Sequence, residues 1–153
     1  KGSTFYFTLP CTLDESSEIL HETKRFNNNK DRLAGKTILV AEDVVSNYQL
    51  LNAFLSQSQV NVLWAQNGVE AVDIFTKNRN IDIILMDIQM PLMDGLMALK
   101  KIREIDTKIP VIVNSAFYKE EEMEKSLASG CTEYMSKPLR KEDLLIKLSH
   151  YIG

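Results

Sequence analysis

The sequence is poor in the features that define several classes of protein. Its 153 residues include only two cysteines, Cys11 and Cys131, in unrelated contexts, which supports neither a disulfide framework nor a zinc site. No apolar run approaches the roughly 18 to 20 residues of a membrane span. Basic residues do not exceed acidic ones, with 18 Lys and Arg against 21 Asp and Glu, which argues against binding to nucleic acid or to an anionic membrane. We therefore expect a cytoplasmic chain that contacts neither membrane nor nucleic acid.

The first 34 residues differ in composition from the rest. Residues 4–9 are rich in aromatic side chains and place Phe5, Phe7 and Leu9 on one face, which is typical of a strand, and Pro10 ends the pattern. Residues 11–34 are polar and too poor in apolar side chains to bury a core, so we interpret them as a linker. The chain begins at Lys1 without a signal-peptide pattern, and we expect it to be a piece of a longer polypeptide.

From Gly35 to the end, short apolar runs alternate with segments of helical periodicity. The runs are residues 37–41, 60–64, 81–86, 111–113 and 133–135. The first run, residues 37–41, is short, β-branched and apolar without alternation, as expected for a strand covered on both sides. Five strands alternating with five helices predict an α/β fold, a doubly wound parallel sheet with helices on both faces.

Charged and hydroxyl-bearing residues stand directly after these runs: Glu42, Asp43, Asp87, Ser115 and Lys137. Ligands of such sheets bind beyond the carboxyl ends of the strands, so we expect these side chains to converge. Three carboxylates and one lysine leave a charge of −2, which favours recruitment of a divalent cation. Oxygen ligands without His or Cys favour Mg²⁺ or Mn²⁺, and the site would suit phosphoryl transfer onto a carboxylate.

Four motifs in order resemble the receiver domain of two-component response regulators. They are Ala41-Glu42-Asp43, the run from Met86 to Gly95, Asn114-Ser115-Ala116 and Lys137-Pro138. The resemblance covers residues 36–151. It implies the flavodoxin-like (βα)5 receiver fold with strand order 2-1-3-4-5, over residues 35–153.

The resemblance also implies roles for the residues at the strand ends. Asp87 is the phosphoacceptor. Mg²⁺ is held by Asp87, Asp43 and the backbone carbonyl of Gln89, with Glu42 acting directly or through a water molecule. The donor of the phosphoryl group is a phosphohistidine, carried by a kinase dimerisation domain or by a histidine phosphotransfer domain.

Further residues carry the switch that the resemblance implies. Ser115 and Lys137 bind phosphoryl oxygens, and Ser115 and Tyr134 change conformation with phosphorylation. The Lys137–Pro138 bond is expected to be cis. Two adjacent residues depart from the family pattern. Ser115 replaces a commoner Thr, and Asn114 replaces an aliphatic residue.

The lifetime of the phosphorylated state depends in this family on positions that flank the attacking water. In this sequence they are Gln89 and Phe117. Gln89 can orient a water molecule, whereas Phe117 occupies space that the water would use. We expect exclusion of water to dominate, so that spontaneous dephosphorylation is slow.

Residues 1–10 carry a second resemblance, to the closing strand of a histidine-kinase ATP-binding domain. A kinase strand, a linker and a receiver in that order imply a hybrid sensor histidine kinase, with the parent protein anchored in the inner membrane. An orphan strand with exposed aromatic residues would tend to pair with another strand edge, so we also expect a weak dimer through residues 1–10.

Other functions fit the same fold. A receiver-like interaction module without phosphotransfer would lack the acceptor, the acidic pair or the lysine, and all of these are present. A flavodoxin-like cofactor binder would hold a flavin phosphate in the loop after the first strand, where Glu42 and Asp43 would repel it. A phosphatase with an aspartate nucleophile would carry Asp-x-Asp after the first strand, where this chain has Glu42-Asp43-Val44.

Overall fold

The computed structural model describes residues 32–116 and 120–153 of the chain. The strand predicted at residues 4–9, most of the predicted linker and Phe117 lie outside the described residues. None of the described helices is long and apolar enough to cross a membrane.

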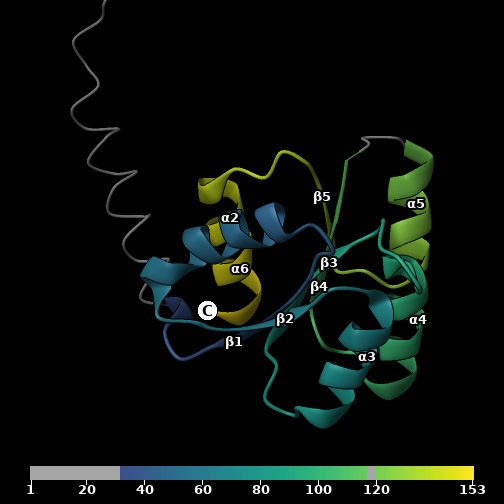
Figure 1. Cartoon of the computed structure of the whole chain (residues 1–153), viewed down its shortest axis with the longest axis horizontal. Helices are drawn as coiled ribbons and strands as arrows, with labels where there is room; N and C mark the ends of the chain where they lie inside the picture. Colours follow the sequence, from purple (N-terminus) through teal and green to yellow (C-terminus); the bar gives the residue numbers. More distant parts are fainter. Residues whose placement is uncertain (1–31, 117–119) are drawn as a thin grey trace, which may run out of the picture.

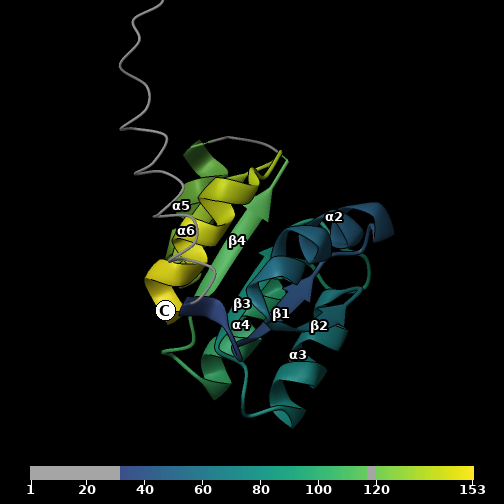
Figure 2. The ribbon, with the colours of Figure 1, turned by 90° about the vertical axis from the view of Figure 1, so that its left-hand side faces the viewer.

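Five parallel strands form a single sheet at the centre of the described chain (Figure 1). They are β1 (Thr37–Ala41), β2 (Asn61–Ala65), β3 (Ile83–Asp87), β4 (Val111–Ser115) and β5 (Glu133–Ser136). Their order is β2-β1-β3-β4-β5, and Figure 2 shows β1 and β4 pointing the same way. The predicted fold class and strand order are confirmed. The change of direction in the strand order at β1 and β3 places the carboxyl ends of these two strands side by side.

Helices cover both faces of the sheet (Figure 1). They are α2 (Val45–Leu55), α3 (Gly68–Lys77), α4 (Gly95–Ile105), α5 (Glu120–Ala128) and α6 (Lys141–Ile152), with a short 3₁₀ turn, η1 (Ser56–Ser58). One apolar cluster joins α2 and α6 to the sheet, and a second joins α3 and α4 to its other face. Alternate residues of each strand therefore enter different clusters, which explains why the strands are apolar without alternation.

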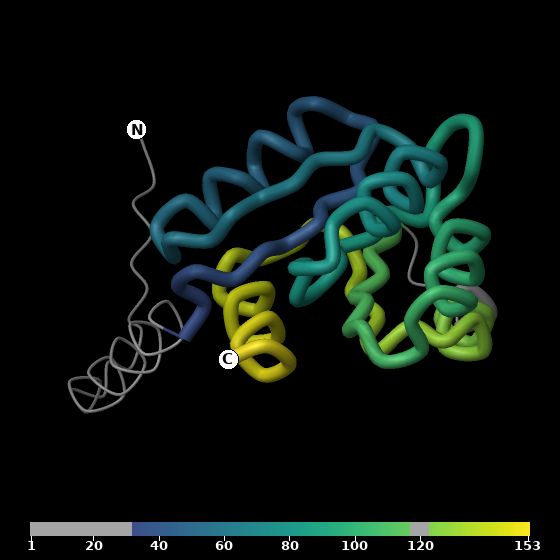
Figure 3. The backbone as a smooth tube through the Cα atoms, turned by 90° about the horizontal axis from the view of Figure 1, so that it is seen from below, coloured from purple at the N-terminus to yellow at the C-terminus, as the bar shows by residue number. Residues whose placement is uncertain are grey.

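The folded unit begins before the boundary predicted from the sequence. Leu33, assigned to the linker, is fully buried in the cluster that contains α2 and α6. Figure 3 shows the first described residues beside the end of α6, which closes the same cluster. Leu33 thus packs with the folded unit although it precedes the predicted boundary at Gly35. A single leucine in a polar stretch shows no periodicity, which is why the sequence pattern missed it.

Local capping fixes the loop that leaves β3. The carboxylate of Asp94 accepts a hydrogen bond from the backbone N–H of Met97 at 2.8 Å and so caps α4. Gly95 follows, and its N–H donates to the carbonyl of Ile88. A side chain at Gly95 would clash with the carbonyl oxygen of Asp87, so only glycine lets the helix start this close to the end of β3.

Candidate functional site

Three acidic side chains meet at the carboxyl edge of the sheet. Glu42 and Asp43 follow β1, and Asp87 is the last residue of β3. One carboxylate oxygen from each lies within 4.8 Å of the others. Glu42 is fully buried, Asp87 is 5% exposed and Asp43 is half-buried. The structure thus brings together the three acids that the sequence singled out.

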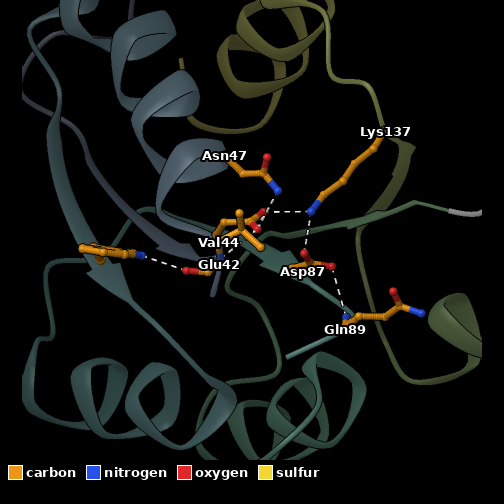
Figure 4. A network of polar contacts seen from close by, with 7 residues as sticks. Glu42, Val44, Asn47, Asp87, Gln89 and Lys137 are labelled. Carbon is orange, nitrogen blue, oxygen red and sulfur yellow. Dashed lines mark hydrogen bonds and ion pairs between the residues drawn. The ribbon is translucent and has the colours of Figure 1, made fainter. Parts of the chain in front are cut away.

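Lys137, just after β5, bridges two of these acids (Figure 4). Its Nζ lies 2.8 Å from Oε2 of Glu42 and 2.5 Å from Oδ2 of Asp87. The other oxygen of Asp87, Oδ1, accepts a hydrogen bond from the backbone N–H of Gln89 at 3.1 Å. One ammonium group therefore compensates part of the charge of two buried carboxylates.

Glu42 has further partners that the sequence analysis did not identify. Its Oε1 accepts a hydrogen bond from Nδ2 of Asn47 at 2.9 Å and from the backbone N–H of Val44 at 3.3 Å (Figure 4). Asn47 lies in the first turn of α2. Its position five residues after an acidic strand end was the available signal. Glu42 is therefore occupied by contacts within the protein.

Asp43 differs from Glu42 in this respect. Among the described residues, its carboxylate makes no hydrogen bond and no ion pair. It is also the most exposed of the three acids. Asp43 is therefore the carboxylate most readily available to an incoming ligand.

The environment shifts two of the titrating groups. Burial raises the pKa of Asp87, and the nearby charge of Glu42 acts in the same direction, against the lowering effect of Lys137. Burial by itself lowers the pKa of Lys137, but its hydrogen bonds to Asp87 and Glu42 outweigh burial and raise the pKa. Lys137 is thus held as a cation, and the buried Asp87 carboxylate is the group on which added positive charge would act.

The donor set fits a hard divalent cation. The cluster of close acidic side chains contains carboxylates without His or Cys, and such oxygen ligands suit Mg²⁺ and Mn²⁺. Asp43 contributes a carboxylate with no competing partner within the described residues. Glu42 would need to release Lys137, Asn47 or Val44 before it could bind a cation directly.

Residues at the end of β4 lie beside Asp87. The register pairs Asp87 with Asn114, rather than with Ser115, which is paired with Ser136 of β5. Ser115 is buried, and its backbone carbonyl accepts a hydrogen bond from the N–H of Lys137 at 2.8 Å. Oδ1 of Asn114 is buried and has no hydrogen-bond partner in the described part of the chain. The unusual Asn114 is therefore the strand neighbour of Asp87.

Three of the predicted site residues remain: Tyr134, Pro138 and Gln89. Tyr134 is 8% exposed and belongs to the apolar cluster with α3 and α4, so it is not a surface residue in this structure. The Lys137–Pro138 peptide bond is cis. The side chain of Gln89 is exposed.

Comparisons with known proteins agree with this site. The profile of the response regulator receiver domain matches residues 38–149. The autoinducer 2 sensor kinase/phosphatase LuxQ of Vibrio vulnificus is 32% identical over 154 residues, which cover 99% of this chain and 18% of that protein. This chain thus spans less than a fifth of the length of that relative.

Solved structures give the same result. The receiver domain of the sensor histidine kinase PA1611 from Pseudomonas aeruginosa, with a magnesium ion in its active-site cleft, has a TM-score of 0.73 at 31% identity, over 78% of this chain and 99% of that one. The receiver domain of Ssk1, solved with the Saccharomyces cerevisiae histidine phosphotransfer protein Ypd1, has a TM-score of 0.73 at 27% identity, over 78% and 90%. The chain belongs to the response regulator receiver domain family.

Proposed function

We propose that this chain accepts a phosphoryl group from a phosphohistidine onto Asp87, in a Mg²⁺-dependent step. The observation that carries the proposal is the setting of the Asp87 carboxylate. It is nearly buried at a strand end, bound by Lys137 on one oxygen and by the N–H of Gln89 on the other, and close to Asp43.

The step is a direct transfer between two groups. One oxygen of Asp87 forms a bond to phosphorus while the bond between phosphorus and the donor imidazole nitrogen breaks, and that nitrogen keeps the electron pair. The product is an acyl phosphate on Asp87 and an unphosphorylated histidine. Lys137 already contacts Asp87, and its ammonium group would pair with an oxygen of the transferred group. The hydroxyl of Ser115 would donate a hydrogen bond to another oxygen.

The metal ion would be held by Asp43, Asp87 and the backbone carbonyl of Gln89. Glu42 would contact the ion directly or through a water molecule. When bound, Mg²⁺ supplies positive charge that offsets the repulsion between the carboxylates and the phosphoryl oxygens. The free carboxylate of Asp43 supports this assignment. Mn²⁺ suits the same oxygen ligands.

We infer that the donor is a histidine-containing protein. The Ypd1–Ssk1 complex, in which a similar receiver domain is bound to a histidine phosphotransfer protein, supports this inference. The match to a sensor kinase extends over 99% of this chain, which supports a hybrid sensor kinase as the parent protein. Residues 1–10 would then be the last strand of the kinase part, and residues 11–34 would connect it to the receiver.

We further infer that phosphorylation shifts the conformation of Ser115 and Tyr134. Tyr134 packs in the apolar cluster and is almost fully buried. A change in its position would therefore alter the packing of the surrounding helices. The role of Phe117 in excluding water, and hence slow dephosphorylation, remains a prediction from the sequence.

Labelling with a small phosphodonor tests the assignment of Asp87. The chain is incubated with acetyl phosphate and Mg²⁺, and the added phosphoryl group is followed by intact mass. Asp87→Asn should abolish the label. Asp94→Asn is the matched control, because Asp94 lies in the same loop and asparagine caps a helix as well as aspartate does. Labelling of Asp87→Asn at the wild-type level would overturn the proposal.

A further inference from the structure

We propose that Trp64 is a positioning residue for the metal-binding turn, holding Glu42 and Asp43 in place from the edge of the sheet. This inference rests on the proposed metal site. Trp64 is the single tryptophan of the chain. It lies in β2, the edge strand next to β1, and nothing in its sequence context pointed to the site.

The evidence begins with the backbone of Glu42. Its N–H donates to the carbonyl of Ala65 at 3.0 Å. Its carbonyl oxygen accepts a hydrogen bond from Nε1 of the Trp64 indole at 2.8 Å. Strand pairing between β1 and β2 ends at Ala41 and Ala65. The indole therefore supplies the hydrogen bond that fixes the chain one residue beyond the end of the ladder.

The indole is itself held in place. The rings of Tyr48 and Trp64 stack with centroids 4.2 Å apart and planes inclined by 4°. Tyr48 belongs to α2, the helix that follows the acidic turn. The stack thus limits the rotamers of Trp64 and keeps its N–H directed at the carbonyl of Glu42.

The hydrogen bond from Trp64 mainly affects the direction of the Asp43 side chain. The carbonyl held by Trp64 belongs to the peptide unit that joins Glu42 to Asp43. The Glu42 side chain has three partners of its own, whereas the Asp43 carboxylate has none among the described residues. The direction of Asp43 therefore depends on its backbone. Fixing that backbone before a metal ion binds lowers the ordering cost of binding.

Mn²⁺ binding followed by electron paramagnetic resonance tests this role. Trp64→Phe keeps an aromatic ring against Tyr48 but removes the N–H donor together with part of the indole ring. We expect it to weaken Mn²⁺ binding roughly three- to tenfold, the effect of losing about one hydrogen bond. Tyr48→Phe keeps the stack and should bind Mn²⁺ like the wild type.

Two controls separate positioning from general destabilisation and from failure of the metal site. Phe54 and Tyr48 pack against the same apolar cluster. Phe54→Leu alters packing there without touching the turn, and should leave Mn²⁺ affinity unchanged. Asp43→Ala should remove binding. If the wild type binds no Mn²⁺, or Asp43→Ala binds it normally, the proposed metal site is wrong.

If the wild type binds Mn²⁺, Asp43→Ala does not, and Trp64→Phe binds with wild-type affinity, the role of Trp64 is wrong. An equal loss in Phe54→Leu and Trp64→Phe would also overturn it.

Discussion

The two ends of β3 are equally buried but chemically opposite. Residues 83–86 are apolar, 0–2% exposed, and enter the clusters on the two faces of the sheet in turn. Asp87 follows them at 5% exposure, among charged groups. Burial of each apolar side chain stabilises the fold by about 1.5–3 kcal/mol. Burial of Asp87 raises its pKa and opposes its ionised form. The same strand therefore supplies stability at one end and, in our proposal, reactivity at the other.

The largest expected effect on stability lies at the apolar end. Leu85 is 2% exposed in the cluster with α2 and α6. Leu85→Ala should reduce the free energy of unfolding by about 2–5 kcal/mol, measured by urea denaturation, because it leaves a cavity in a closely packed core. Leu50→Ala is the control. Leu50 is 51% exposed on α2, and its loss should change stability by less than about 1 kcal/mol. Equal losses in the two variants would contradict this description of the core.

The apolar pattern is what made the fold predictable from the sequence. Residues 37–41 are buried on both faces, and their side chains are therefore apolar without alternation. Such a short apolar run predicts a strand from the sequence alone. The acidic strand ends were predictable for a related reason, because parallel strands bring their carboxyl ends to one edge. The strand order itself came from the resemblance to receiver domains.

Contacts between distant segments could not be predicted in this way. Trp64 reaches the carbonyl of Glu42 across 22 positions of sequence, and its side chain leaves no periodic signal. Leu33 is part of the core although the stretch that precedes it is polar. The register that places Asn114 beside Asp87 is fixed by strand pairing, which the sequence specifies only within a residue or two.

At the charged end, we expect Asp87→Asn to raise stability at neutral pH. The pKa of Asp87 is higher in the folded than in the unfolded chain, so its ionisation above that pKa lowers the free energy of unfolding. The variant cannot ionise and should melt at a higher temperature than the wild type. Below the ordinary carboxyl pKa, Asp87 is protonated in both states, and the difference should vanish.

Melting curves across the acidic range measure this difference. The advantage of Asp87→Asn should shrink steadily as the pH falls through the raised pKa of Asp87. Asp94→Asn, an exposed cap, should follow the wild type throughout. An advantage that is absent at neutral pH, or that grows on acidification, would show that burial does not oppose the charge of Asp87.

The smallest expected effect concerns the two asparagines of the site. Asn114→Val replaces a buried amide whose oxygen has no partner in the described chain, and should raise stability by about 1 kcal/mol. Asn47→Val removes a donor to the buried Glu42 and should lower stability by about 1–3 kcal/mol. Chemical denaturation of both variants distinguishes the partnered from the unpartnered group. A loss of stability in Asn114→Val would mean that its amide is satisfied in solution.

Trapping of the modified residue tests the central claim most directly. The unmodified chain is treated with acetyl phosphate and Mg²⁺ and then with borohydride, which reduces an acyl phosphate to an alcohol. Digestion and mass spectrometry then locate the residue that has changed. The account predicts that Asp87 becomes homoserine and that Glu42, Asp43 and Asp94 do not change. A reduced residue at any of those positions, with Asp87 intact, would contradict it.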